Sequence, residues 1–368
     1  MANVRTFYAC QKVMLGHVSG SDAVGTITAA SFDTINSLQS VGITSNFNLE
    51  PVYQIGALEP GDIAEDIPDV EISLTRTLDG SQTIYERTMI KEGEATAARD
   101  LTECSDNRSA VKLLIYPQTV TKATGAITSA CMIRPAYLSS ISYSFPTDGF
   151  FQEEATVVGN NKTWSLSDGD STNDAPSEKS AQTGVARRQF LNTAGSVFPI
   201  AIGAVHGGGD FTKFSGAMPP DARIQNISVS VDLGREEIFE LGKRLPFTRY
   251  INFPVEVNTE FEVISASGDL VGAEETDEVC KNPKALAFKS IKIATCDGMV
   301  LDMGDKNKLQ SVSAAGGDAG GDNVTYTYSY VNYSKFKYTS PSAGSHHPDA
   351  AKQMEQVDLD SFNMQDYK

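Results

Sequence analysis

Few residues in this 368-residue chain have the types and spacing that enzyme chemistry needs. The run from His206 to Gly209 has the composition of a loop that binds the oxyanion in acyl transfer. That chemistry also needs a serine nucleophile in a Gly-x-Ser-x-Gly turn, and the sequence contains none. Gly242 and Lys243 lack the upstream glycine and the following Ser or Thr of a phosphate-binding loop. We therefore predict that the protein is not an enzyme.

The potential metal ligands do not group at the spacings that metal sites require. His346 and His347 are adjacent, but no cysteine or further histidine lies near them in the sequence. Residues 168–174 are acidic like a calcium-binding loop, yet they lack the glycine and the terminal glutamate at the spacing of an EF-hand. The five cysteines are far apart and form no Cys-x-x-Cys pair, which indicates free thiols. We predict that the chain holds no metal ion or cofactor.

The charge of the chain limits its partners. Its 47 acidic and 30 basic residues give a formal net charge of -17, and the pI is near 4.7. Such a surface does not hold nucleic acid by neutralising phosphates, so any contact with DNA should be brief and non-specific. No apolar run approaches the roughly 18 residues of a membrane helix, and the N-terminus lacks a secretory leader. We predict a protein that folds in a cytosol and does not insert into a membrane.

One stretch, from Asp232 to Val263, organises the rest of the chain. After Pro254 its residues alternate between apolar and polar, which is the pattern of a half-buried strand with one acidic face. The residues expected to face the core are Val255, Val257, Thr259, Phe261 and Val263, and those expected to face away are Glu256, Asn258, Glu260 and Glu262.

The chain contains a second version of this stretch, at residues 48–74. Four residues there, Ile55, Gly56, Pro60 and Pro68, precede Leu241, Gly242, Pro246 and Pro254 by 186 positions each. Tyr53 stands opposite Phe239 at the same offset, and the run from Val70 to Ile72 corresponds to Val255–Val257 with one residue of slip. We interpret the match as an internal duplication.

Strand patterns dominate both halves of the sequence. We predict an all-β fold with minor α content, made of two tandem β-sandwich or barrel domains at 1–165 and 185–340. Residues 166–184 should be a linker or exposed loop, and residues 341–368 a C-terminal tail. Residues 76–85 contain an Asp-Gly turn between strand-like flanks, and residues 95–101 are the best helix candidate.

The two versions of the repeat differ in charge. Residues 48–71 contain seven acids and no base, whereas residues 232–256 contain five acids and four bases. One interpretation is drift on solvated surfaces. The other is that the acidic version in one subunit meets the basic version in a neighbour, which would set register and specificity.

The second version carries a family resemblance. Residues 227–263 resemble the strand, loop and Pro-Val-Glu-Val strand of phage tail tube proteins, and the hairpin segments SISYS and SVSAAGGD are also similar to that family. The resemblance implies two tail-tube-like domains whose strands join those of neighbouring subunits into a barrel around a channel. It further implies that the chain forms stacked rings, has the tape-measure protein and other tail proteins as partners, and allows transient passage of DNA. It also implies a place in the virion tail after assembly in the host bacterial cytoplasm. A duplicated chain would form rings of three subunits with pseudo-sixfold symmetry.

Two sets of residues follow as candidate sites. Those expected at contacts between subunits are Tyr53, Ile55, Gly56, Arg235, Phe239, Leu241, Gly242, Lys243 and Arg244. Those expected to line the channel are Glu71, Glu256, Glu260 and Glu262, because an acidic wall repels DNA; the alternative is that they face the outside of the tail. Two other functions remain open: a ring or baseplate hub component of the same fold, and a ligand-binding β-protein.

Overall fold

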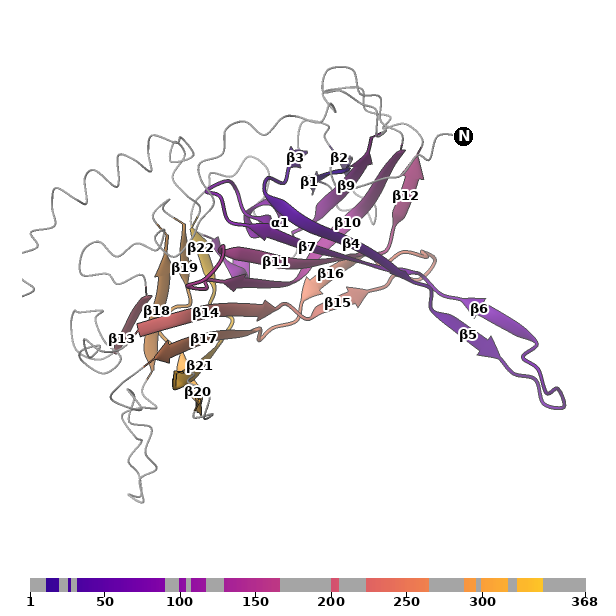
Figure 1. Cartoon of the computed structure of the whole chain (residues 1–368). Coiled ribbons are helices and arrows are strands. Elements are labelled where there is room, and N and C mark those ends of the chain that lie inside the picture. The colour runs from indigo at the N-terminus through magenta and orange to yellow at the C-terminus, as the bar shows by residue number, and fades with distance from the viewer. Residues whose placement is uncertain are drawn as a thin grey trace, which may run out of the picture.

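The computed structural model describes residues 11–19, 26–27, 32–89, 99–103, 107–116, 129–165, 200–204, 223–264, 288–295, 299–316 and 323–339. The expected linker and tail, the acidic segment 168–174, and His206, His346 and His347 lie outside these residues. The described part is almost entirely β, and every strand pairing in it is antiparallel (Figure 1). The prediction of an all-β fold with minor helix is therefore confirmed, and the described strands form no closed barrel.

The elements of the first half are, in chain order, β1 (Gln11–Ser19), β2 (Thr26–Ile27), β3 (Asp33–Thr34), β4 (Leu38–Asn46), β5 (Leu49–Val52), β6 (Asp62–Glu65), β7 (Asp69–Thr77), α1 (Ile84–Met89), β8 (Arg99–Asp100), a 3-10 turn (Leu101–Glu103), β9 (Ser109–Ile115), β10 (Ser129–Ser144), β11 (Gln152–Gly159) and β12 (Lys162–Ser165). Those of the second half are β13 (Ile200–Ala204), β14 (Arg223–Asp232), β15 (Arg235–Ile238), β16 (Thr248–Ile251), β17 (Glu256–Ile264), β18 (Lys289–Ala294), β19 (Val300–Asp302), β20 (Lys308–Ala315), β21 (Thr325–Tyr333) and β22 (Lys337–Thr339).

Eight strands form one continuous run in the main sheet, in the order β4-β7-β11-β10-β14-β17-β21-β20. The pairing of β10 with β14 joins the two halves of the chain, with Ser140 opposite Asp232 and Ser144 opposite Ser228. Side chains alternate along each strand, so most apolar residues of these strands face one side and most serines, threonines and acids face the other; Glu153 and Thr259 are polar residues buried on the apolar side. The described run ends in two edges, β4 and β20.

Strand β10 passes from one layer of the sandwich to the other. Its first part, up to Ala136, pairs with β9 and β12, and its second part pairs with β11 and β14. The register with β9 shifts between Ile133 and Ala136, around Pro135, which has no N–H to donate to a ladder. This one strand therefore positions both layers of the first half.

A second sheet, in the order β13-β18-β19-β22-β8, supplies the second layer behind the other half (Figure 1). Strand β8 belongs to the first half of the chain but pairs with β22, with Asp100 opposite Lys337. One cluster of buried side chains includes Ile72 and Leu138 from the first half together with Phe261 and Tyr338 from the second. The two halves therefore share this main core, and a smaller separate cluster in the first half includes Met14 and Leu114.

The segment after β7 differs from the expected hairpin. The Asp-Gly turn is followed by helix α1, which begins at Ile84. The backbone N–H groups of Ile84 and Tyr85 donate to the carboxylate of Glu153 on β11, at 2.9 and 3.2 Å, and Glu86 N–H donates to the Thr83 hydroxyl. These acceptors satisfy the free amides of a helix start. The local sequence could not predict the role of Glu153, because it lies 69 residues after Ile84. Of the helix expected at 95–101, the described residues are strand β8 and the start of a 3-10 turn.

The same strand arrangement occurs twice in the main sheet. The strands β4-β7-β11-β10 form one set of four, and β14-β17-β21-β20 form the other. Each set has two register shifts in corresponding strands: between Leu38 and Ser40 and between Leu138 and Ser140 in the first, and between Ile224 and Asn226 and between Leu309 and Ser311 in the second. Val70 and Val257 have matching places in these ladders, opposite Ser45 and Val231, so Val257 rather than Val255 is the counterpart of Val70.

Candidate functional site

Two β-hairpins project from corresponding places in the two sets of strands. Strands β5 and β6 form the first arm, defined as residues 49–65, and β15 and β16 form the second arm, residues 235–251. Leu49 pairs with Glu65 in the first, and Arg235 pairs with Ile251 in the second. Each residue of the second arm lies 186 positions (235 minus 49) after its counterpart, so the two arms have the same length and register.

Each arm turns at a glycine that the backbone conformation requires. Gly56 has φ +94° and Gly242 has φ +87°, which is the left-handed region where a side chain causes strain. A Cβ atom at either position would meet nothing within 4 Å, so the requirement comes from the backbone and not from packing. Both glycines of the predicted contact set therefore shape the tips that carry its apolar members.

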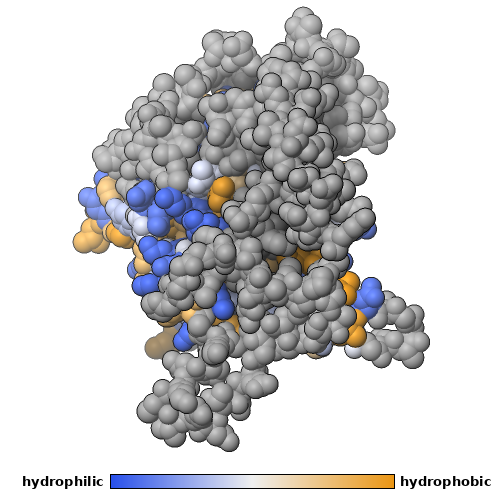
Figure 2. All heavy atoms as spheres, turned by 90° about the vertical axis from the view of Figure 1, so that its left-hand side faces the viewer, coloured by the Kyte–Doolittle hydropathy of each residue, from blue (hydrophilic) through white to orange (hydrophobic). Residues whose placement is uncertain are grey.

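The arms carry most of the large hydrophobic side chains that the described residues expose. Tyr53, Ile55 and Leu58 are exposed around the tip of the first arm, and Phe239 and Leu241 around the tip of the second. At the opposite end of the molecule, which Figure 2 faces, hydrophilic and hydrophobic described residues lie intermixed on the surface. Exposed apolar side chains concentrated on two projections are typical of a contact with another protein.

The base of the second arm packs on the first half of the chain through Arg249. This guanidinium donates to Asp69 Oδ1 at 2.9 Å and to Asn160 Oδ1 at 2.9 and 3.1 Å, and it also pairs with Glu237. Arg249 is buried, whereas Asp69 and Glu237 keep some contact with solvent. The network connects β16 to the start of β7 and the end of β11.

Arg235 makes the second connection between this arm and the first half. Its Nε donates to the carbonyl oxygen of Leu138 on β10 at 2.8 Å, and its guanidinium carbon lies 5.6 Å from the centre of the Tyr137 ring. The Tyr137 hydroxyl also lies 3.5 Å from the hydroxyl of Thr248. Arg235 was predicted at a contact between subunits; within the chain, its guanidinium contacts Leu138 and Tyr137 of the first half.

The remaining basic members of the expected contact set are on the surface. Lys243 forms an ion pair with Glu240 at 2.8 Å, with both side chains about half exposed, and Arg244 is exposed beside it. The sequence contained one sign that Arg249 is special: the residue at the same position in the first arm is the apolar Ile63. The partners of Arg249 lie 89 and 180 residues away, and sequence reasoning missed them.

The first arm has no comparable platform in the described chain. Figure 1 shows it extending away from the body beyond the ends of β4 and β7. Leu49 and Ile63, the counterparts of Arg235 and Arg249, are 57% and 52% exposed. The structure thus brings the second arm onto the first half and leaves the first arm in solvent.

The four glutamates expected along the channel share the polar face of the main sheet. Glu71 lies on β7, and Glu256, Glu260 and Glu262 lie on β17, with their strand neighbours buried on the other side. A shallow hollow on this face contains no Lys or Arg among its lining residues; its polar lining is Ser73, Thr75, Ser140, Ser142, Glu154, Thr156, Ser230, Asp232, Glu256 and Asn258. The face offers hydroxyls and carboxylates in a repeating pattern.

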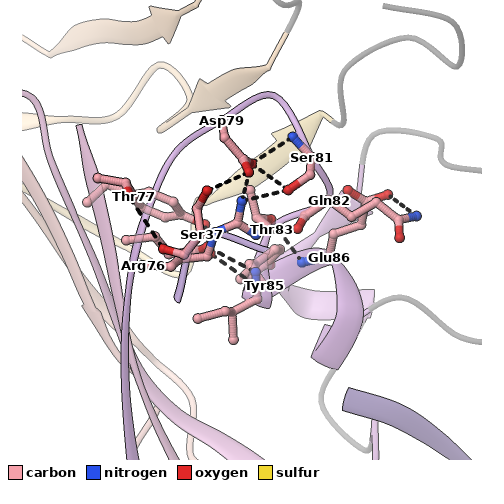
Figure 3. Close-up of polar contacts among 12 residues, drawn as sticks. Ser37, Arg76, Thr77, Asp79, Ser81, Gln82, Thr83, Tyr85 and Glu86 are labelled. Carbon is pink, nitrogen blue, oxygen red and sulfur yellow. Dashed lines mark hydrogen bonds and ion pairs between the residues drawn. The ribbon is translucent and has the colours of Figure 1, made fainter. Parts of the chain in front are cut away.

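A buried polar cluster next to α1 is the other concentration of charged groups (Figure 3). Arg76 is inaccessible to solvent, and its guanidinium contacts Asp79 at 2.8 Å, Glu153 at 3.8 Å and the backbone carbonyl of Gln82. Burial raises the pKa of Glu153, and the charge of Arg76 opposes that rise. Because the cluster is sealed, we assign it the structural role of fixing the 78–83 loop and the start of α1.

Other kinds of site are not evident in the described part of the chain. Its residues include no group of three His, Cys, Asp or Glu side chains that could hold a metal ion. Cys131 is a buried free thiol, and burial raises its pKa. Within the same residues, no helix has the length and apolarity to cross a membrane.

Comparisons with known proteins give likenesses of structure only. No protein-family model matches the chain, and no curated protein matches it. The tail tube of SPP1 matches with a TM-score of 0.28 and 11% identity, covering 47% of this chain and 98% of that one. The chain is similar to tail tube and Hcp proteins.

Two further structures show the extent of the likeness. The sheath-tube complex of an extracellular contractile injection system matches with a TM-score of 0.29 and 10% identity, covering 45% of this chain and 94% of that one. A crystal structure of an Hcp protein matches with a TM-score of 0.24 and 13% identity, covering 42% and 98%.

Proposed function

We propose that this protein is a structural subunit of a phage tail, which assembles with copies of itself into stacked rings that form the tail tube. The observation that supports the proposal best is the seam between β10 and β14. There, one set of four strands continues directly into the second set, as two subunits of a ring would. The duplication of the tube domain is part of this proposal.

The free edges of the sheet are the counterparts of the two strands in that seam. Strand β20 corresponds to β10, and β4 corresponds to β14, so a second copy can continue the sheet by pairing its β4 with β20 of the first. The apolar residues on these edges, Val41, Ile43 and Val312, pack against the core but stay partly exposed. Their counterparts in the seam, Ile227, Val229 and Ile141, are fully buried. An edge pairing between copies would bury the remaining apolar area.

The register of this pairing follows from the seam. Ser140 stands opposite Asp232 and Tyr143 opposite Val229 inside the chain. Ser311 on β20 holds the place of Ser140, and Asn46 on β4 holds the place of Asp232. The same register therefore puts Ser311 of one copy opposite Asn46 of the next. Repeating the step closes a ring, and three copies would give six sets of strands, the pseudo-sixfold arrangement of the duplicated type.

The polar face of the sheet would then line the channel. Its carboxylates repel a DNA duplex within roughly a Debye length, about 8 Å at physiological ionic strength. The hollow on this face has no Lys or Arg in its lining, so it adds no affinity through counterion release, and DNA can pass it without being retained. The tape-measure protein and DNA are proposed occupants of this channel, and other tail proteins are proposed neighbours of the tube.

Electron microscopy of the purified protein tests the proposal, together with sedimentation over a range of concentrations. We expect rings and stacked tubes. The variant Val312→Lys should raise the concentration needed for assembly about tenfold or more, because a lysine in the edge ladder opposes pairing. The same substitution at the exposed, non-strand residue Val324 is the matched control.

The outcomes separate the alternatives. Rings that do not stack would favour a baseplate or other ring component, and a chain that stays monomeric at high concentration would contradict the proposal. Equal assembly of Val312→Lys and Val324→Lys would contradict edge pairing as the mechanism.

A further inference from the structure

We propose that the first arm of one copy docks on the β20–β21 region of a second copy, with Ile63 against Tyr333 and Asp62 against Lys308. This inference rests on the proposed self-assembly and adds a specific contact to it. The template is the docking of the second arm on the first half, which the chain makes within itself.

The platform beneath the second arm consists of residues in the middle of β10 and just after the end of β11. Asn160 follows β11 and accepts from Arg249, and Tyr137 on β10 lies against Thr248 of β16. Asp69, at the start of β7, completes the contact. These three residues define the surface that an arm contacts when it packs on the body of the protein.

Ladder registers identify the corresponding platform in the second half. Gly159 pairs with Val70 and Asn332 pairs with Val257, so the next residues, Asn160 and Tyr333, correspond.

Lys308 is found in the same way. Tyr137 pairs with Val158, and Lys308 pairs with Val331, one position before the register shift begins in each case. Lys308 is therefore the counterpart of Tyr137. It is exposed, and its ammonium lies 5.4 Å from the centre of the Phe288 ring.

The counterparts in the arms come from their shared register. Arg249 corresponds to Ile63, and Thr248 corresponds to Asp62. Arg235 corresponds to Leu49 in the same register.

The substitutions on the two sides of the contact match each other. Where the seam inside the chain has Arg249 bonded to Asn160, the contact between copies would have Ile63 against Tyr333, which is 60% exposed. The Arg–Asn hydrogen bonds are exchanged for an aliphatic side chain against an aromatic ring, so no guanidinium or amide is left without a partner, and the hydroxyl of the largely exposed Tyr333 can stay in water. Burying an aliphatic and an aromatic side chain together is favourable.

The second exchange is one of charge. Tyr137 and Thr248 inside the chain become Lys308 and Asp62 between copies, an ammonium facing a carboxylate. Glu256, the counterpart of Asp69, is exposed and accepts from Asn258 at 3.0 Å, so it can stay at the rim of the contact. Opposite charges at matching positions favour this register over others.

The contact can form only between copies. The first arm projects from the β4 edge of the sheet, and its platform is at the β20 edge, with six strands between them. Pairing β4 of one copy with β20 of the next would bring the arm beside that platform, because the second arm stands beside β10 in the same way.

Crosslinking between two singly substituted proteins tests the inference. Assembled mixtures of Ile63→Cys and Tyr333→Cys protein, treated with a short bis-maleimide, should give a two-chain product at least about tenfold more than either protein alone, since docking raises the effective concentration of the pair. Glu50→Cys mixed with Tyr333→Cys is the control, because Glu236, the counterpart of Glu50, is exposed in the seated arm.

A charge exchange gives a second readout. Asp62→Lys should weaken assembly, and Lys308→Asp in the same chain should restore it. Tubes or rings that form without the Ile63–Tyr333 product would overturn the docking and leave the proposed function intact. A chain that forms no assembly at any concentration would overturn both.

Discussion

Replacing Arg249 by methionine should loosen the second arm from the body of the protein. Methionine keeps most of the apolar stem and removes the guanidinium that contacts Asp69, Asn160 and Glu237. The substitution therefore isolates the polar connection between β16 and the first half from the packing around it.

The size of the effect follows from what each partner loses. Hydrogen bonds to a charged group contribute about 1.5–3 kcal/mol each, and breaking a buried ion pair costs about 3–5 kcal/mol. The side chains of Asp69 and Glu237 are 48% and 25% exposed, so water can solvate them after the change, which reduces the loss. Asn160 is buried and loses the donor to its oxygen. We expect the free energy of unfolding to fall by about 2–4 kcal/mol.

Urea unfolding followed by far-ultraviolet circular dichroism measures this change, at a concentration low enough to avoid assembly. Arg244→Met is the control, because Arg244 is exposed on the same arm and should change stability by no more than about 0.5 kcal/mol. Arg249→Lys should fall between the two, since lysine keeps the charge but not the forked geometry. Equal stability of Arg249→Met and Arg244→Met would refute the reasoning, and would also weaken the template for docking the first arm.

Three further outcomes are expected. Burial in the folded state raises the pKa of Glu153 above its ordinary value of 4.5. Between that value and the raised pKa, the folded state binds a proton that the unfolded state releases, so the stability from this group is full below 4.5 and is lost as pH rises through the folded pKa. Urea midpoints measured across this pH range should therefore fall relative to those of Glu153→Gln, and parallel curves would contradict the assignment. Gly242→Ala or Gly56→Ala should cost about 1 kcal/mol of local stability through backbone strain, seen as faster amide exchange at that arm tip with little change in global unfolding; uniform destabilisation would count against it. Assembled protein with both Glu256→Lys and Glu260→Lys should retain short DNA duplexes at low salt and release them as salt rises, whereas parent assemblies should not retain them, and equal retention would argue that this face is not the channel wall.

Local patterns were sufficient to predict the strands that have one buried face. The alternation after Pro254 predicted β17, and Val257, Phe261 and Val263 are buried as expected. On β14, Ile227, Val229 and Val231 alternate with Ser228, Ser230 and Asp232 in the same way, and the three apolar residues are buried. These predictions succeed because side chains on a strand point to opposite sides in turn, which is a property of the local backbone.

Local patterns failed where a distant residue decides the structure. The segment after Thr77 looked like a hairpin, yet α1 begins there because Glu153 accepts from its first amides. Sequence spacing also paired Val70 with Val255, whereas the ladder registers give Val70 and Val257 matching positions, and those registers depend on the neighbouring strands.

The sequence by itself determined that the chain is β-rich and acidic, that two segments match in glycine and proline spacing at an offset of 186 residues, and that the strand after Pro254 has one polar face. These properties reside in composition, side-chain alternation and backbone conformation, which act over a few residues. Only the tertiary structure decided that β10 pairs with β14, that Arg249 holds one arm against the body, and that the other arm and two sheet edges are left free. The reason is physical: strand pairing and buried ion pairs join residues far apart in the chain, and their partners are chosen by the packing of the whole sheet.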